Sequence, residues 1–325
     1  MDNRGLLDLT ISLLPGLKAP ERIKLLQTFD EEDELFIQSK RDIENLLKRG
    51  IKDFWDISNI RDKAGRIDTI CGMRSIKWVS FMNGEYPPLL REMYDPPSVI
   101  FYRGVLPNPE KSLLGMVGTR RPSPEASEQA KKIAYEIGRV GVSVVSGLAL
   151  GIDAMSHRGN LDAGARGFAV LGSGIDQVYP SSNRPLAKRI LDSGGALISE
   201  YPPGVRPGKW TFPARNRIIS ALSRSVLIVE APLKSGALIT ANFALEQGKD
   251  LWVTSCGVKK NAFFDRRGTE GLAEDGAQVI SCAQDITEKW GIDIAPNMRN
   301  DAVSGDQICR RALVSSIADF LEIEV

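Results

Sequence analysis

The chain has 325 residues, with 42 lysines and arginines against 41 aspartates and glutamates and a formal net charge of +1. This balance excludes a global basic field for nucleic acid or membranes, so any anion-binding site must be local. A single histidine excludes a metal site built from several histidines, and four cysteines without CxxC spacing indicate neither a disulfide framework nor a zinc site. No apolar run approaches the roughly 18 residues of a membrane span and the N-terminus is unlike a signal peptide, so we expect a cytoplasmic protein.

Residues 1–80 are predicted to form a small helical domain. The motif LPGL separates two amphipathic runs, which is typical of two short helices joined by a glycine-containing turn. A helix-hairpin-helix that binds DNA phosphates at this turn is one interpretation. We favour a helical bundle for packing or partner contact, because the turn lacks a second glycine and the acidic EEDE that follows would repel phosphate.

Residues 81–111 are predicted to be an extended connector that joins the sheet domain. The segment is rich in proline, which excludes a long helix or a central strand. One short run in it, SVIFYRG, is expected to be a strand.

Residues 112–292 are predicted to form an α/β domain with a doubly wound, mainly parallel, extended Rossmann-like sheet. Short runs rich in β-branched residues alternate with amphipathic segments, several of which end in glycine, and this alternation indicates right-handed βαβ units. The expected strands are LLGMVGTR, VSVVSG, GFAVLGSG, GALISE, SVLIVEAP, DLWVTSC and QVISC. The expected helices are EASEQAKKIAYEIGRVG, GIDAMSHRGNLDAG, NRPLAKRILDSG, RNRIISALS and GALITANFALEQG.

The loops that follow these strands carry the small, hydroxyl and glycine residues that let backbone N–H groups approach an oxyanion. In parallel sheets, ligands bind at this edge, over the helix N-termini. The first turn reads GTRRPSP and lacks the GxGxxG of dinucleotide sites, and a P-loop is also absent, so no cofactor is predicted.

The segment FPARNRIISALS carries the strongest charge signal. Arg215 and Arg217 flank Asn216, a candidate N-cap where a loop is expected to become a helix. No acidic residue lies between Glu200 and Glu230, whereas five basic residues do. Together with arginine and lysine from neighbouring loops, these guanidinium groups are expected to bind phosphate, which they match bidentately. Two aromatic residues of the same loop are candidates for base stacking or for anchoring the loop: Trp210 and Phe212.

The predicted phosphate- or DNA-binding residues are Gly118, Thr119, Arg120, Ser146, Gly147, Gly151, Asp153, Arg215, Asn216, Arg217, Lys234, Ser235, Gly236 and Thr240. No catalytic or metal-binding residue is predicted. The only histidine, His157, is interpreted as a helix-surface or partly buried residue with local hydrogen bonds, in preference to a catalytic base.

From about Tyr86 to Ala283, the motifs YPPLL, GTR, SGLALGIDAMSH, VLGSGIDQVYPSSN, FPARNRIISALS and VLIVEAPLKSGALITANFALEQG resemble, in order, those of the bacterial DNA-processing family DprA, also called Smf. The resemblance implies an extended Rossmann domain that binds single-stranded DNA in a basic pocket at the edge of the sheet. It also implies a homodimer that loads the RecA recombinase onto incoming strands during natural transformation, or competence. The mechanism would be binding and hand-over, without covalent chemistry.

The resemblance also assigns roles by motif position. Arg120 and the Gly147–Gly151 loop would hold phosphates, Arg215 and Arg217 would line the pocket, and the backbone N–H groups of a Ser-Gly pair at 235–236 would close it. The chain departs from the family after Tyr179-Pro180, where some members carry a lysine and this chain has two serines.

The two ends of the chain are interpreted through the same resemblance. The N-terminal region fits the family's sterile-alpha-motif-like domain. Many members continue into a C-terminal winged-helix domain, whereas residues 293–325 are predicted to be a short tail without a complete one.

Two other classes of protein share this kind of core. Phosphoribohydrolases that cleave nucleoside 5′-monophosphates carry a PGGxGTxxE loop, but KSGALIT stands at the comparable place here and no glutamate follows at that spacing. A nucleotide-sensing Rossmann protein without catalysis is the third interpretation.

Overall fold

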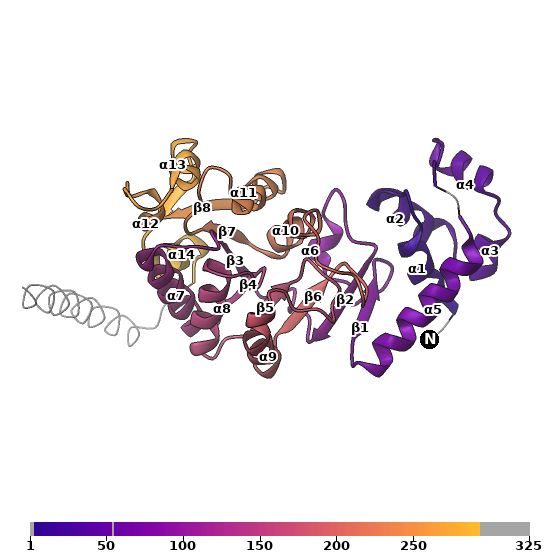
Figure 1. The fold of residues 1–325 in the computed structure, drawn as a ribbon, viewed down its shortest axis with the longest axis horizontal. Coiled ribbons are helices and arrows are strands. Elements are labelled where there is room, and N and C mark those ends of the chain that lie inside the picture. The colour runs from indigo at the N-terminus through magenta and orange to yellow at the C-terminus, as the bar shows by residue number, and fades with distance from the viewer. Residues whose placement is uncertain (1–2, 54, 293–325) are drawn as a thin grey trace, which may run out of the picture. The chain divides into compact units, whose positions relative to one another are not determined.

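The computed structural model describes residues 3–53 and 55–292 (Figure 1). Residues up to Ser281 belong to one compact unit, and Cys282 begins a second, of which residues 282–292 are described. The predicted tail 293–325 lies outside the described residues.

One nine-stranded sheet has the order β1-β2-β6-β5-β4-β3-β7-β8-β9. Its strands are β1 (Lys77–Ser80), β2 (Val99–Gly104), β3 (Leu113–Val117), β4 (Ser143–Ser146), β5 (Gly167–Val170), β6 (Ala196–Ser199), β7 (Ser225–Ile228), β8 (Asp250–Thr254) and β9 (Gln278–Ile280). Strands β3 to β9 pair in parallel, while β1 with β2 and β2 with β6 pair antiparallel. All seven strands predicted between residues 112 and 292 are confirmed.

The helices of the N-terminal segment and connector are α1 (Asn3–Leu13), α2 (Ala19–Thr28), α3 (Glu32–Phe36), α4 (Lys40–Leu47), α5 (Ile57–Met73) and α6 (Pro88–Arg91). Those that follow are α7 (Pro124–Arg139), α8 (Ile152–Asp162), α9 (Arg184–Asp192), α10 (Thr211–Leu222), α11 (Gly236–Glu246), α12 (Ser255–Val258), α13 (Arg267–Glu274) and α14 (Ala283–Trp290). The five helices predicted in the α/β domain are present as α7 to α11.

Both faces of the sheet are covered, which explains why its strands are continuously apolar. Along β5, Phe168 and Val170 face a core that includes residues of α10 and α11, while Ala169 faces a core that includes residues of α8 and α9. Figure 1 shows α8 and α9 on the opposite side of the sheet from α10 and α11. Strands β4 to β6 extend from one side of β3 and β7 to β9 from the other, so the strand order switches sides between the parallel strands β3 and β7. A ligand site is expected at the carboxyl ends of these two strands.

The N-terminal helices pack against the sheet as well as against one another. One cluster of buried residues lies among α1 to α5, and a second joins Leu9 and Ile67 to Phe101 of β2 and Leu197 of β6. The edge strand β1, with sequence KWVS, was not predicted, since four residues are too short for a periodic signal. The domain boundaries at 80, 111 and 292 stay predictions.

The LPGL turn between α1 and α2 is occupied by protein groups. Arg49 donates to the carbonyl of Gly16 at 2.7 Å and Trp55 donates to that of Pro15 at 3.1 Å. Gly16 has a φ of 69°, and a Cβ there would lie 2.0 Å from a carboxylate oxygen of Asp53. An acidic group over the turn disfavours phosphate, which agrees with the helical-bundle interpretation.

Candidate functional site

A cavity of about 770 Å³ lies where the strand order of the sheet switches sides, at the ends of β3 and β7. Most of the predicted site residues line it, and they come from four separate loops or helix starts. They are Gly118, Thr119, Arg120, Asp153, Arg215, Asn216, Lys234, Ser235, Gly236 and Thr240. Ser146, Gly147, Gly151 and Arg217 do not line it.

Four exposed cations surround this cavity: Arg120, Arg121, Lys209 and Lys234. Among the residues that the structure describes, none of the four has a salt-bridge partner. The cavity lining includes one acidic residue, Asp153, which is buried. Unpaired cations around a concave surface concentrate anions there, although the whole chain is nearly neutral.

Several aromatic residues lie near these cations. The guanidinium carbon of Arg120 lies 5.4 Å from the centre of the Phe212 ring, and the Tyr179 ring lies 5.7 Å from the same ring. Tyr179 and Trp210 are largely exposed. Such a cluster offers flat faces on which a nucleobase can stack next to a bound phosphate.

Arg215 and Asp153 form the floor of the cavity and not its rim. Arg215 is 4% exposed, and its guanidinium donates to the carbonyl oxygen of Val170. Burial lowers the pKa of Arg215 to about 10 and raises the pKa of Asp153, each partly offset by the opposite charge of the other residue. Arg215 therefore lines the cavity as a buried cation, and its part in binding a ligand stays a prediction.

Arg217 lies on the other side of its helix. It donates to Glu200 at 2.7 Å and to Asp95 at 2.9 Å, and it is 6% exposed. Burial opposes its charge, yet these two carboxylates hold the pKa of Arg217 above its ordinary value. Because α10 begins at Thr211, five residues before the expected N-cap, neighbouring arginines point to different faces of the helix. The structure thus places Arg217 in a buried ion pair and away from the cavity.

Asn216 is inside α10 and does not cap it. Its side-chain amide donates to the carbonyl oxygen of Gly236 at 3.1 Å, which ties α10 to the start of α11. At that start Ser235 is the N-cap and accepts from the backbone N–H of Ala237. The hydroxyl of Thr240, one turn further, is buried at the cavity and has no hydrogen-bond partner among the described residues.

In the loop from Ser146 to Gly151, two backbone N–H groups are engaged by one buried side chain. One carboxylate oxygen of Asp153 accepts from the backbone N–H groups of Gly147 at 3.1 Å and Ala149 at 3.3 Å. A Cβ on Gly147 would lie 2.1 Å from the guanidinium of Arg215, so only glycine admits that arginine. These two amides are therefore engaged by Asp153, and phosphate binding by the Gly147–Gly151 loop stays a prediction.

His157 is completely buried, and neither ring nitrogen has a hydrogen-bond partner among the described residues. Burial, with a contribution from Arg215, lowers the pKa of His157 to about 3. The interpretation of a surface or locally hydrogen-bonded histidine is therefore wrong. Its burial also separates it from the cavity, which it does not line.

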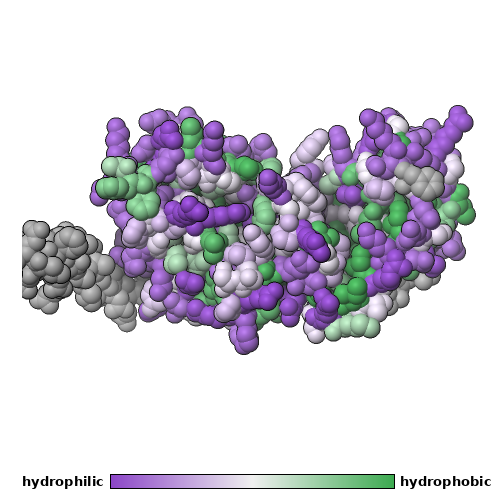
Figure 2. Space-filling view, in the orientation of Figure 1, coloured by the Kyte–Doolittle hydropathy of each residue, from purple (hydrophilic) through white to green (hydrophobic). Residues whose placement is uncertain are grey.

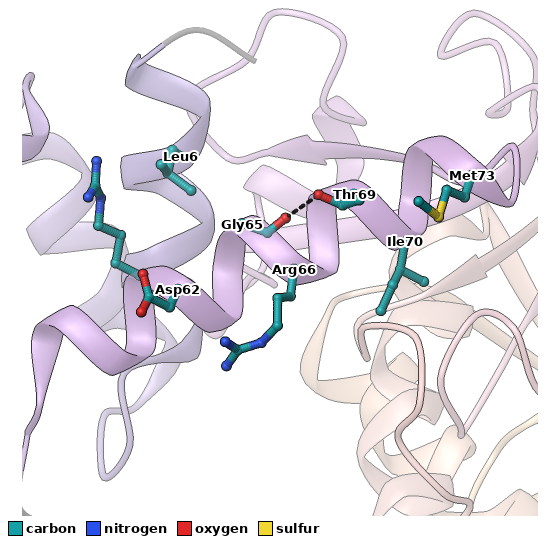
Figure 3. Close-up of a pocket in the computed structure, with 8 residues that line it drawn as sticks. Leu6, Asp62, Gly65, Arg66, Thr69, Ile70 and Met73 are labelled. Carbon is teal, nitrogen blue, oxygen red and sulfur yellow. Dashed lines mark hydrogen bonds between the residues drawn. The ribbon is translucent and has the colours of Figure 1, made fainter.

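A second hollow, of about 630 Å³, lies between α1 and α5 (Figure 3). Its wall is largely apolar, with Leu6, Ile70 and Met73, and Figure 2 shows hydrophobic residues gathered over this helical part of the chain. Of its cations, Arg61 is paired with Glu32 at 2.8 Å. It lacks the convergent basic groups of the first cavity.

No helix in residues 3–53 or 55–292 is long and apolar enough to cross a membrane. Within the same residues no three His, Cys, Asp or Glu side chains are placed to hold a metal ion. A Rossmann-like sheet whose strand order switches sides at a basic pocket, with aromatic rings beside cations that have no salt-bridge partner among the described residues, is typical of α/β proteins that bind phosphate-containing ligands.

Comparison with known proteins identifies the family. The model of "DNA recombination-mediator protein A" matches residues 77–291, and the chain belongs to this family. It is 37% identical over 237 residues to the DNA processing protein DprA of Bacillus subtilis, covering 72% of this chain and 78% of that protein. It is 43% identical over 211 residues to protein Smf of Synechocystis, covering 64% of this chain and 52% of that protein. The chain thus spans about half the length of the Synechocystis relative.

Two solved structures are similar in fold. DprA of Streptococcus pneumoniae superposes with a TM-score of 0.69 at 28% identity, covering 91% of this chain and 99% of that chain. DNA processing protein A of Helicobacter pylori superposes with a TM-score of 0.57 at 29% identity, covering 66% of this chain and 95% of that chain. The structure of the Helicobacter pylori protein is described in terms of its single-stranded DNA binding mode.

The cavity lining also includes residues that were not predicted as site residues, among them Arg121, Tyr179 and Lys209. Arg121 is the second arginine of GTRR and Lys209 lies in the acid-free segment, so a charge signal was present for both. Tyr179 carried no such signal, because it reaches the cavity through its stacking on Phe212.

Proposed function

We propose that this chain binds single-stranded DNA in the cavity at the ends of β3 and β7, and that it does so without catalysis. The observation that carries the proposal is the group of four exposed cations, which have no salt-bridge partner in the part of the chain that the structure describes and lie beside the Tyr179–Phe212 pair. Phosphates would pair with the cations and release counterions, and bases would stack on the aromatic rings, so binding is tolerant of sequence.

The finer role follows from the family. A recombination mediator that binds a strand must pass it to a recombinase, so we extend the proposal to hand-over of the strand to RecA during DNA processing and natural transformation, by a homodimer in the cytoplasm. The relative from Helicobacter pylori, whose single-stranded DNA binding mode has been described, supports single-stranded DNA as the proposed ligand.

An enzyme that cleaves nucleoside monophosphates is less well supported. Asp153 is the acidic residue of the cavity lining, and its carboxylate is engaged by two backbone N–H groups beneath Arg215. A general acid or base must reach the substrate, and this carboxylate is buried.

The test is a binding titration by fluorescence anisotropy with a labelled oligonucleotide of thymidines, competed with unlabelled duplex of the same length and with AMP. We expect the single strand to bind at low salt, duplex to compete weakly and AMP to remain intact. If the single strand did not bind and AMP were consumed, the proposal would be wrong and the chain would be an enzyme that cleaves nucleoside monophosphates. RecA filament formation on a strand covered by single-strand-binding protein then tests hand-over, which we expect this chain to accelerate.

A further inference from the structure

An arginine-glutamate pair lies buried behind the DNA-binding cavity and does not line it. Glu230, just after β7, is 1% exposed, and Arg266, at the N-cap of α13, is 2% exposed. Arg266 Nε donates to a carboxylate oxygen of Glu230 at 2.8 Å. Two charges removed from water are costly to bury, so their position needs an explanation beyond packing.

Glu230 holds both ends of the loop that carries two of the four pocket cations. Its backbone carbonyl accepts from the N–H of Thr119 at 2.7 Å, and its second carboxylate oxygen accepts from the N–H of Ser123 at 2.7 Å. Between these two anchored amides lie Arg120 and Arg121. Glu230, in the loop after β7, therefore restricts the positions of Arg120 and Arg121.

We call these contacts of Glu230 with Thr119 and Ser123 the clamp. Arg266 adds to the clamp and neutralises the charge of the Glu230 carboxylate. Arg266 Nη2 donates to the Ser123 hydroxyl at 3.0 Å, and Arg266 Nη1 donates to the carbonyl oxygen of Lys259 at 2.9 Å. Without Arg266, an uncompensated carboxylate would lie buried behind a site for phosphates, where it would repel them. The next residues extend the connection, since the N–H groups of Gly268 and Thr269 donate to the carbonyl of Ala231.

We propose that Glu230 and Arg266 are positioning residues for DNA binding: the pair fixes the 119–123 loop so that Arg120 and Arg121 face the cavity, and it cancels the charge of the fixing carboxylate. The inference rests on the proposed function. It concerns residues that do not touch the ligand, and its consequence is that affinity depends on a hydrogen-bond acceptor at position 230.

Two double variants that differ in this acceptor test the idea. Glu230→Gln/Arg266→Met and Glu230→Ala/Arg266→Met both remove the two charges, so neither leaves an unpaired buried ion. Only glutamine keeps an oxygen that accepts from Ser123 N–H. We expect the glutamine variant to bind the oligonucleotide within about threefold of wild type and the alanine variant to bind roughly tenfold more weakly, the loss of about one hydrogen bond. Arg267→Met, which removes the exposed neighbouring arginine paired with Asp265, is the control and should bind like wild type.

Amide hydrogen exchange of the DNA-free variants supplies a readout that does not depend on the ligand. We expect faster exchange at Ser123 in the alanine variant than in the glutamine variant, with equal exchange in the core strands. Equal affinity of the two double variants, or equal exchange at Ser123, would overturn the positioning role. A wild-type chain that bound no oligonucleotide would overturn the proposed function and the role in binding with it, whereas the exchange arm would still report whether the clamp exists.

Discussion

Two arginines separated by one residue have opposite environments in this protein. Arg215 lies under the cavity beside Asp153, whereas Arg217 is held by Glu200 and Asp95. The sequence could show that both lie in an acid-free segment, but it could not show that acidic residues from distant segments, at 95 and 200, would reach one of them. The basic segment therefore indicated the region of the cavity, but it did not indicate which of its arginines line the cavity.

The first prediction separates a structural arginine from a binding one. Arg217→Met should lower the free energy of unfolding by about 2 kcal/mol, because it removes the buried guanidinium that pairs with two partly exposed carboxylates. Arg120→Met should change it by less than about 0.5 kcal/mol, since the Arg120 side chain is exposed and unpaired at the cavity. Urea unfolding followed by circular dichroism measures both. Equal effects of the two substitutions would contradict these assignments.

The second prediction concerns the only histidine. The pKa of His157 is about 3 in the folded chain and about 6.5 in an unfolded chain, so on acidification the unfolded state takes up a proton that the folded state does not. Stability from this residue is thus complete above pH 6.5 and falls as the pH drops towards 3, by about 1.4 kcal/mol per pH unit.

Comparison of His157→Leu with wild type isolates this effect. Between pH 7 and pH 5, wild type should lose about 2 kcal/mol more unfolding free energy than the leucine variant. Carboxylates titrate mostly below this window and are common to both proteins. An identical pH dependence of the two would show that the histidine is not buried as described.

At the scale of elements, the β4–α8 loop depends on one glycine. Gly151 has φ 74° and ψ −127°, a region essentially restricted to glycine, and a Cβ there would lie 2.4 Å from the carbonyl oxygen of Thr119. The sequence showed a glycine-rich loop at this position. It could not show that the glycine allows close contact with the β3–α7 loop.

The third prediction follows from that contact. Gly151→Ala should cost about 3 kcal/mol of unfolding free energy and should weaken DNA binding, because it displaces the loop that carries Arg120. Gly164→Ala is the control: its φ is 79°, but a Cβ there meets no atom within 4 Å. The control should cost only about 1 kcal/mol and leave binding unchanged. Thermal unfolding with anisotropy measures both, and equal losses of affinity would count against the loop contact.

For the whole molecule, alternation of strands and helices predicted the parallel sheet, because each βαβ unit is encoded by a contiguous stretch of sequence. The strand order and the antiparallel edge of β1 and β2 were not predictable, since they depend on pairing between distant segments. The same limit applies to the site. The predicted strand ends indicated which loops would form the site. The contact between Glu230 and Arg266 was not predictable, because it joins residues 36 positions apart and leaves no local pattern in the sequence.

The central claim is that exposed cations around the cavity bind the phosphates of a single strand. The most direct measurement is the slope of the logarithm of the binding constant against the logarithm of salt concentration, for wild type, Arg120→Gln/Lys234→Gln and Arg224→Gln. Arg224 is an exposed arginine of the same acid-free segment that does not line the cavity. Each phosphate contact on a single strand contributes about 0.7 to the slope, so the double variant should bind with a slope about 1.4 shallower than wild type, and Arg224→Gln with an unchanged slope. Equal slopes for all three proteins would contradict the claim.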